Sequence, residues 1–215
     1  MTPLPALSLL ETRVLGVLVE KQHTVPDTYP LTLNALVSGS NQKTSRDPVI
    51  EATEAEVQAA MDHLKTLSLV VESSGGRVMR FAQNVGRVLQ LPPQSVALLA
   101  VLFLRGPQTA GELRINSDRL HKFGDISSVE GFLNELAERH FVKELYRQPG
   151  ARETRWAHLL SGDVASAPPP VNEAPAGDAV TVSEIAVLKA NVDQLQAEVA
   201  SLKETLARIC KELGL

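Results

Sequence analysis

Cysteine is almost absent, because the 215-residue sequence holds only one, Cys210. A single thiol cannot form a disulfide within the chain or a zinc site built on several cysteines. Such sparing use of cysteine suits a reducing compartment. The first residues, MTPLPALSLLE, place no basic residue ahead of their short apolar run, which argues against a secretory signal. The sequence therefore predicts a cytoplasmic protein.

Long hydrophobic runs, aromatic residues and an excess of charge are also missing. Aromatic residues make up 4% of the chain, and the net charge is −4. A membrane-spanning helix needs about 20 consecutive apolar residues. The longest uncharged run, between Arg87 and Arg105, is interrupted by prolines and glutamines. We therefore expect no membrane association, and any nucleic-acid binding must come from local basic patches.

Sequence motifs of enzymes are absent as well. The five histidines are scattered without HExxH spacing, and no G-x-S-x-G, P-loop or dinucleotide-binding glycine pattern occurs. The glycines that begin GGRV at Gly75 are predicted to form a turn between strands and not a phosphate-binding loop. We therefore expect no enzymatic activity, no metal site and no cofactor.

One short basic sequence motif occurs twice, 75 positions apart. It reads GGRVMRFA at residues 75–82 and GARETRWA at residues 150–157. Each copy closes a segment in which hydrophobic periodicity predicts three helices and then two short strands. The helices are predicted within residues 8–22, 31–39 and 53–67 of the first segment, and within 92–106, 109–115 and 127–140 of the second.

The two segments correspond residue by residue. Apolar positions of the third helix and the first strand recur at an offset of 72, and the pairs are Val57 and Val129, Met61 and Leu133, Leu64 and Leu136, and Val70 and Val142. Three helices and a hairpin in about 75 residues are the plan of a winged helix. We predict a mainly α fold with small β-hairpins (α+β), built as winged-helix domains at residues 1–87 and 88–162. Phe81 and Trp156 are expected in the cores.

The C-terminal part has a different composition. Residues 163–181 are rich in proline and alanine, which is typical of a linker. In residues 182–215, apolar residues occupy heptad positions a and d over about four heptads. This pattern predicts a coiled-coil helix that forms a parallel homodimer, and the alternative is a helix that folds back on its own domains. The predicted seam consists of Ile185, Leu188, Val192, Leu195, Val199, Leu202, Leu206 and Ile209.

The stretch ETRVLGVLVEKQHTVPDTYPLTLNALVSGSNQKTSRDPV resembles the N-terminal signature of the YceH-like proteins. PLTLNAL followed by NQKTSRDPV is its most specific part, and the resemblance runs over residues 8 to about 160. These bacterial proteins have no assigned biochemical function and are understood to consist of tandem winged-helix domains. The resemblance therefore implies the fold, whereas DNA binding would follow from it by analogy alone.

The basic residues avoid the helices that would read DNA. A winged helix usually inserts its third helix into the major groove, yet residues 53–67 and 127–139 each carry three carboxylates and one Lys or Arg. Cations lie instead in the loops before these helices and on the wings. Candidate contacts to DNA phosphates are Lys43, Arg46, Arg77, Arg80, Arg152 and Arg155. For Arg46, an ion pair within the fold with Asp27 or Asp47 is the alternative.

These observations leave two functional hypotheses. The first is a DNA-associated, transcription-regulator-like protein that contacts mainly the phosphate backbone of double-stranded DNA. The alternative is a protein-interaction adaptor without DNA affinity. DNA-binding domains are often strongly basic, but residues 8–87 hold eight Lys or Arg against nine Asp or Glu, and residues 88–162 hold nine against eight.

Overall fold

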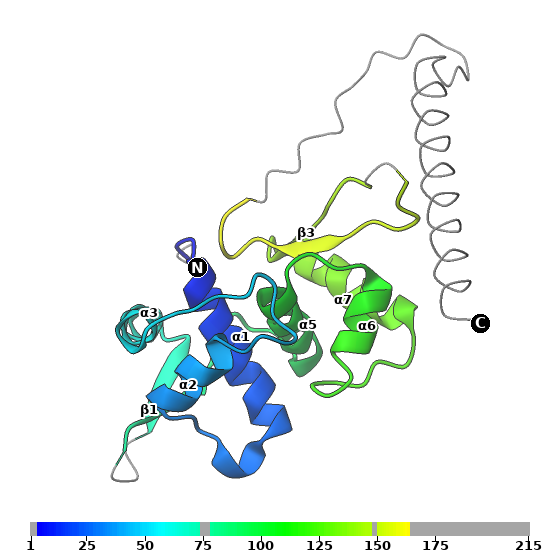
Figure 1. Cartoon of the computed structure of the whole chain (residues 1–215). Coiled ribbons are helices and arrows are strands. Elements are labelled where there is room, and N and C mark those ends of the chain that lie inside the picture. The colour runs from blue at the N-terminus through cyan, green and yellow to red at the C-terminus, as the bar shows by residue number, and fades with distance from the viewer. Residues whose placement is uncertain (1–3, 74–77, 148–149, 164–215) are drawn as a thin grey trace, which may run out of the picture. The chain divides into compact units, whose positions relative to one another are not determined.

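The computed structural model describes residues 4–73, 78–147 and 150–163 (Figure 1). This part of the chain combines helices with two small antiparallel hairpins, so the prediction of helices combined with small β-hairpins is confirmed. Three predictions fall on positions outside the described residues. They concern the wing residue Arg77, the linker and the coiled coil of residues 182–215 with its seam.

The first half of the described chain consists of three helices, a hairpin and a short closing helix. The elements are α1 (Leu9–Thr24), the 3-10 turn η1 (Pro26–Thr28), α2 (Leu33–Ser40), α3 (Glu54–Thr66), β1 (Val70–Ser73), β2 (Arg80–Gln83) and α4 (Val85–Val88). The second half follows the same order with α5 (Pro93–Arg105), α6 (Ala110–Asn116), α7 (Ile126–Glu138), β3 (Val142–Glu144) and β4 (Trp156–His158).

Capping residues explain where the helices begin. The Ser8 hydroxyl accepts a hydrogen bond from the Glu11 amide, and the Glu11 carboxylate accepts one from the Ser8 amide. Thr53 and Glu56 form the same reciprocal pair at the start of α3. Each pair satisfies two backbone N–H groups that have no partner within the helix. Both boxes follow the pattern of a hydroxyl residue followed three positions later by glutamate.

The two hairpins are tied to their halves in the same way. Phe81 lies opposite Glu72 in the first hairpin, and Trp156 lies opposite Glu144 in the second. Each aromatic residue also exchanges two backbone hydrogen bonds with the segment before the second helix, Phe81 with Leu31 and Trp156 with Gln108. Both aromatic side chains are buried, as predicted. The internal repeat is therefore structural as well as sequential.

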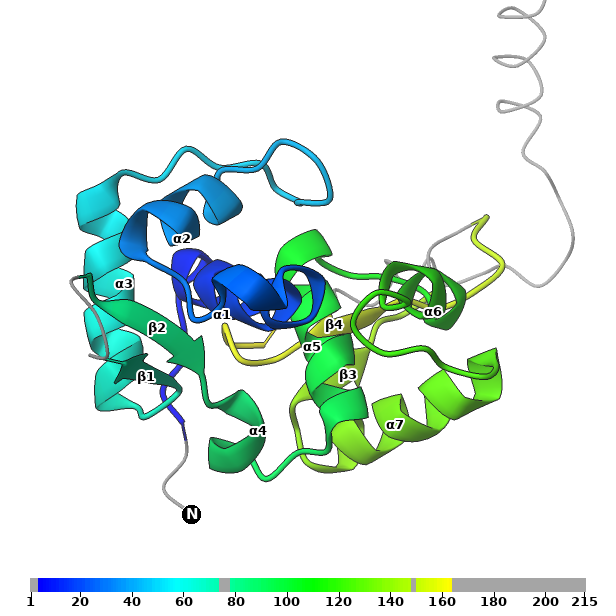
Figure 2. The same ribbon diagram turned by 90° about the horizontal axis from the view of Figure 1, so that it is seen from below.

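A single hydrophobic core runs through both halves, and α1 and α5 pack against each other at its centre (Figure 2). Gly16 permits their close approach, because a Cβ atom there would lie 2.8 Å from Leu104 Cγ. The four offset-related apolar pairs are all buried. The predicted boundary after residue 87 falls within α4, and the division into two independent domains stays a prediction.

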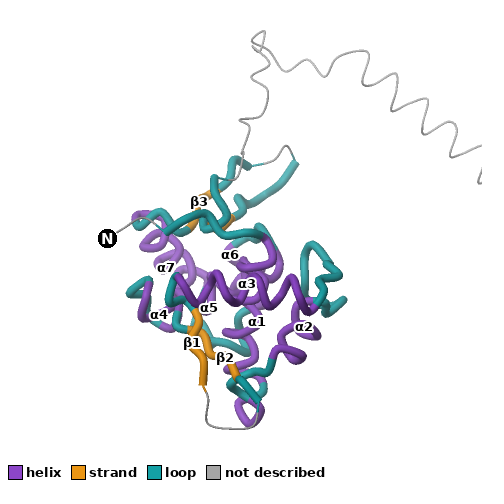
Figure 3. Tube along the Cα trace, turned by 90° about the vertical axis from the view of Figure 1, so that its left-hand side faces the viewer, coloured by secondary structure: helices purple, strands orange, loops and turns teal. Residues whose placement is uncertain are grey.

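The two hairpins lie on opposite sides of this helical centre (Figures 1 and 3). Each hairpin packs beside the third helix of its own half, β1 against α3 and β3 against α7. Among the residues that the structure describes, no helix has the length and apolar character needed to cross a membrane.

Candidate functional site

The polar loop between α2 and α3, residues 41–52, is closed at its base by a pair of hydrogen bonds. Asn41 Nδ2 donates to the Ala52 carbonyl at 2.8 Å, and the Ala52 amide donates to Asn41 Oδ1 at 2.7 Å. One side chain therefore holds both ends of the loop together. The ten residues between Asn41 and Ala52 therefore form a loop whose two ends are hydrogen-bonded to each other.

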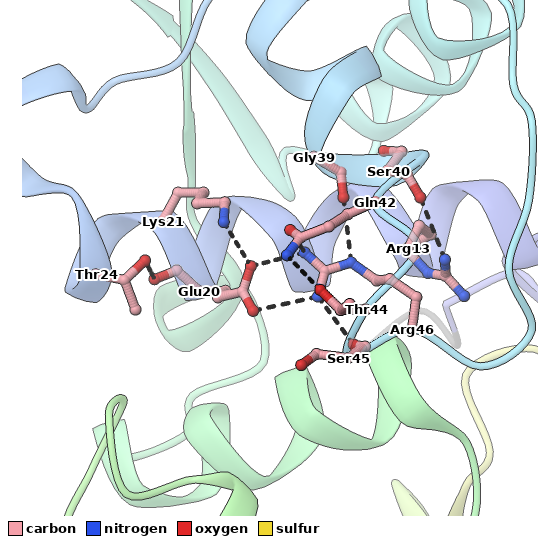
Figure 4. Close-up of polar contacts among 10 residues, drawn as sticks. All are labelled: Arg13, Glu20, Lys21, Thr24, Gly39, Ser40, Gln42, Thr44, Ser45 and Arg46. Carbon is pink, nitrogen blue, oxygen red and sulfur yellow. Dashed lines mark hydrogen bonds and ion pairs between the residues drawn. The ribbon is translucent and has the colours of Figure 1, made fainter.

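Arg46 points inward from the centre of this loop (Figure 4). Its side chain is fully buried, and its guanidinium forms a bidentate pair with Glu20 of α1, with Nη2 2.7 Å from Oε2 and Nη1 3.2 Å from Oε1. Burial raises the pKa of the Glu20 carboxyl, but the hydrogen bonds and positive charges of Arg46 and, to a smaller extent, Lys21 together outweigh burial and lower this pKa overall. Glu20 is therefore held as a carboxylate.

The remaining donors of Arg46 are also engaged within the fold. Nε donates to the Gly39 carbonyl at 3.1 Å, Nη1 donates to the Ser45 carbonyl, and Nη2 donates to Gln42 Oε1. An arginine has five N–H groups, and all five have partners. Arg46 is therefore not available to a phosphate in this structure. Arg46 thus forms an ion pair within the fold, which was the alternative to phosphate binding. Its partner is Glu20 and not Asp27 or Asp47.

A second buried arginine supports the loop from α1. Arg13 is fully buried, and its two terminal nitrogens donate to the Ser40 carbonyl at 3.3 Å and the Pro48 carbonyl at 2.7 Å. Burial lowers the pKa of this guanidinium. Sequence reasoning missed Arg13, because a single arginine in a helix is normally expected on its solvated face. The residues three and four positions away on the helix, Leu9, Leu10, Gly16 and Val17, carry no polar side chain, and that was the available signal.

The second half of the molecule also fixes the loop. The Asp47 amide donates to the Leu104 carbonyl at the end of α5, at 2.8 Å. Ser45 adopts a φ of 60°, which L residues other than glycine seldom do. The three residues Lys43, Thr44 and Ser45, which we call the loop tip, are exposed. The buried arginines thus form a rigid base beneath a short exposed peptide.

The other predicted cations are distributed over the molecule. Arg80 Nη1 donates to the carbonyls of Thr28 and Pro30, at 3.0 and 2.8 Å. Arg155 is its counterpart, because Nη1 donates to the Pro107 carbonyl at 2.9 Å and Nη2 lies 3.3 Å from Glu112 Oε1. Both arginines therefore tie a hairpin to the segment before the second helix.

Only two of the predicted DNA-contacting residues, Arg46 and Arg155, line the same cavity. Arg155 lines a polar cavity of about 310 Å³ together with Ser45 and Arg46. Arg152 is exposed and lines a different groove, beside α7. Lys43 is exposed at the loop tip. The structure therefore gives Arg46, Arg80 and Arg155 contacts within the fold and leaves Lys43 and Arg152 with exposed charges.

The chemistry that this arrangement offers is recognition by hydrogen bonds and charge. The loop tip presents an ammonium group and two hydroxyls in a fixed backbone conformation. The outer faces of the third helices are acidic, and their exposed carboxylates belong to Glu54, Glu56 and Asp62 on α3 and to Glu130, Glu135 and Glu138 on α7. In the described part of the chain, no group of three His, Cys, Asp or Glu residues could hold a metal ion.

Comparisons with known proteins identify a family without giving an activity. A family model described as "Protein of unknown function, DUF480" matches residues 7–151. The UPF0502 protein Bcep1808_3727 of Burkholderia vietnamiensis is 58% identical over 97% of this chain and 90% of its own length. The UPF0502 protein Bcen2424_5610 of Burkholderia cenocepacia is 57% identical over 100% of this chain and 94% of its own length.

Proposed function

The chain belongs to the DUF480 family, and from its structure we propose that it is a protein-interaction adaptor built from two winged-helix domains. The repeated order of three helices and a hairpin supports the winged-helix assignment. The matching pairs of backbone hydrogen bonds at Phe81 and Trp156 support it further, because they attach each wing to its own half as a third short strand would.

The acidic outer faces of α3 and α7 carry the proposal. A third helix that enters the major groove approaches phosphates on both sides, and its cations normally neutralise them. Here both helices expose three carboxylates each. Like charges facing each other across an interface cost free energy and suppress the wrong partner. The surface that would meet DNA in a winged helix is thus better suited to a protein.

The internal use of the arginines supports the same choice. Arg46, Arg80 and Arg155 donate their hydrogen bonds to carbonyls and carboxylates of the fold. They serve to position the loop and the wings. A rigid loop held on a packed scaffold is a common way to present a binding surface, because little conformational entropy is lost on association. We assign partner contact to the loop tip, Lys43 to Ser45.

Site-specific photocrosslinking tests this function. A photoreactive amino acid replaces Thr44 at the loop tip in the full chain, and a control variant carries it at exposed Gln90, in the connection between α4 and α5. The adaptor function predicts one discrete crosslinked partner for position 44, and reduced yield when Lys43 is changed to Glu. Equal labelling at both positions, or crosslinks to nucleic acid only, would refute the proposal.

A DNA-associated, regulator-like function is the second candidate. One observation favours it, because the loops before both third helices expose cations, Lys43 in the first half and Arg119 and Lys122 in the second. Such contacts would reach phosphates and read little sequence. Mobility shift on mixed duplex DNA at 50 and 200 mM salt distinguishes the candidates. Binding that weakens steeply with salt, and weakens further in Lys43→Glu, supports DNA association. No shift at low salt removes it.

A further inference from the structure

A groove of about 510 Å³ lies between α7 and the hairpin of the second half. Figure 2 shows α7 running beside the hairpin of β3 and β4, and side chains from the helix and from the hairpin line the groove. Ile126, Glu130 and Asn134 line the helical side, and all three are exposed. Because they are spaced by four residues, they follow one face of the helix over about 12 Å. About four residues of extended chain have the same length.

The hairpin side of the groove combines an apolar base with charges. Trp156, which is 7% exposed, lies at the base of the groove. Arg147, Arg152 and Glu153 come from the segment that joins β3 to β4. The Thr154 hydroxyl donates a hydrogen bond to Glu144 Oε1 across the hairpin. The groove is thus lined by carboxylates and guanidinium groups beside an indole and an isoleucine side chain.

These charges do not neutralise one another within the fold. In the part of the chain that the structure describes, Glu130, Glu153, Arg147 and Arg152 form no ion pair. The neighbouring Arg155 does form one, with Glu112. Charges of both signs that remain unpaired beside an apolar base select a ligand with complementary charges of both signs.

The first half provides an internal comparison. Asp62 and Glu72 occupy the positions that correspond, at the offset of 72, to Asn134 and Glu144. Lys65 bridges them, with Nζ 2.8 Å from Asp62 Oδ1 and also bonded to Glu72. The residue equivalent to Lys65 is Ala137. The second half therefore lacks the side chain that ties the helix to the wing in the first half.

We propose that this groove binds an extended polypeptide segment that carries a basic and an acidic residue. The basic side chain pairs with Glu130 and Glu153, and the acidic one with Arg147 and Arg152. The aliphatic part of the segment packs on Trp156 and Ile126. The proposal rests on the adaptor function, because it assigns a second contact for the partner protein, and its carboxylates disfavour nucleic acid.

Intrinsic fluorescence reports directly on this groove, because Trp156 is the only tryptophan in the chain. The probes are acetylated, amidated tetrapeptides with two central leucines, lysine at one end and glutamate at the other, in both orders. Control peptides carry two lysines or two glutamates. We expect one mixed-charge order to change the Trp156 emission at saturable concentration, and the like-charged peptides to bind at least about tenfold more weakly.

Variants of the full chain give the matched controls. Glu130→Lys should weaken binding of the mixed-charge peptide about tenfold, because the new ammonium group repels the basic residue of the peptide. Glu135→Lys changes the same charge on α7 outside the groove lining and should leave binding within about twofold. The double variant Glu130→Lys with Arg152→Glu should no longer distinguish the two peptide orders, because each end of the groove then carries one charge of each sign.

Three results of the fluorescence experiments would overturn the proposal. They are the absence of any saturable response to the mixed-charge peptides, equal effects of Glu130→Lys and Glu135→Lys, and a Trp156 response to a mixed-sequence single-stranded oligonucleotide in place of the peptides. The adaptor function is tested independently at Thr44. A partner crosslinked there whose yield is unaffected by Glu130→Lys would leave the adaptor function standing and remove the groove from it.

Discussion

Arg46 and Glu20 are 26 positions apart in the sequence and form a bidentate ion pair whose shortest nitrogen–oxygen distance is 2.7 Å. The pair joins the centre of the loop before α3 to the last turns of α1. The Arg46 side chain is fully buried, and 17% of the Glu20 side chain is exposed. The loop tip therefore takes its conformation from an interaction beneath it and needs no ligand to be ordered.

Removing one member of this pair should destabilise the protein strongly. In Glu20→Gln the Arg46 guanidinium stays buried without a counter-charge, and we expect the free energy of unfolding to fall by about 3 kcal/mol. Urea denaturation measures this change. The double variant Glu20→Met with Arg46→Met should lose less than the sum of the single variants, because no buried charge is left unpaired. Strictly additive losses would contradict the assigned pair.

The same pair predicts a dependence of stability on acid. Burial raises the pKa of Glu20, but Arg46, with a smaller contribution from Lys21, holds this pKa below its usual value. A carboxyl with a lowered pKa in the folded state stabilises the fold fully above its unfolded pKa, about 4.3, and loses this contribution as the pH falls through the folded pKa. Urea midpoints from pH 7 to 3 should fall less steeply for both Glu20→Gln and Arg46→Met than for the wild type. An unchanged slope in either variant would contradict the linkage.

The predicted coiled coil is tested by mass. If residues 182–215 form the dimer seam, the full chain should have twice the mass of one chain by light scattering, and a variant ending at residue 181 should have the mass of one. Leu195→Asp in the full chain is the milder test, because a charge at a d position disrupts the seam and leaves the length unchanged. A dimer that persists in both variants would place the interface elsewhere.

Much of the fold could be predicted because its determinants are local. The capping box at Ser8 and Glu11 and the apolar positions of α3 and α7 are periodic signals within one element. The internal repeat then allowed the helices and strands predicted in one half to be predicted at the matching positions of the other. The candidate site was harder, because the partner of Arg46 depends on how α1 and α2 cross, and no short-range pattern encodes that crossing.

The sequence of α5 carries a signal for the core that the two halves share. Every residue of α5 from Ser95 to Leu104 is buried, and so is every residue of α1 from Glu11 to Val19. A helix that is apolar on all sides is covered on all sides. The run SVALLAVLFL therefore indicates a helix at the centre of the fold. Single bridges such as Leu31 with Phe81 are too short to produce any periodicity.

The arginine that precedes each buried aromatic residue should act on stability. Arg155→Ala removes the hydrogen bond to the Pro107 carbonyl and the contact with Glu112. Because the site is largely exposed, we expect a loss of about 1 kcal/mol in the free energy of unfolding. Arg152→Ala, three residues earlier in the same hairpin, is the matched control and should change stability by less than about 0.5 kcal/mol. Equal stabilities for the two variants would argue against the clamp and restore Arg155 as a candidate ligand contact.

His158 should make the wild-type protein sensitive to mild acid. Its ring stacks edge-on against Phe103, with 4.9 Å between ring centroids, and its Nδ1 has no hydrogen-bond partner among the described residues. Burial lowers the pKa of His158 to about 4. The unfolded chain takes up a proton near pH 6.5 and the folded chain does not, so stability falls as the pH decreases from about 6.5 toward 4.

His158→Phe keeps the aromatic contact and removes this titration. At pH 7.5 the variant should be as stable as the wild type within about 1 kcal/mol. At pH 5 it should be more stable by about a further 2 kcal/mol, because only the wild-type unfolded state gains a proton there. Urea denaturation at the two pH values measures the difference. Parallel changes in wild type and variant between pH 7.5 and 5 would show that His158 is protonated equally in the folded and unfolded chains, and burial of its ring would then not control its charge.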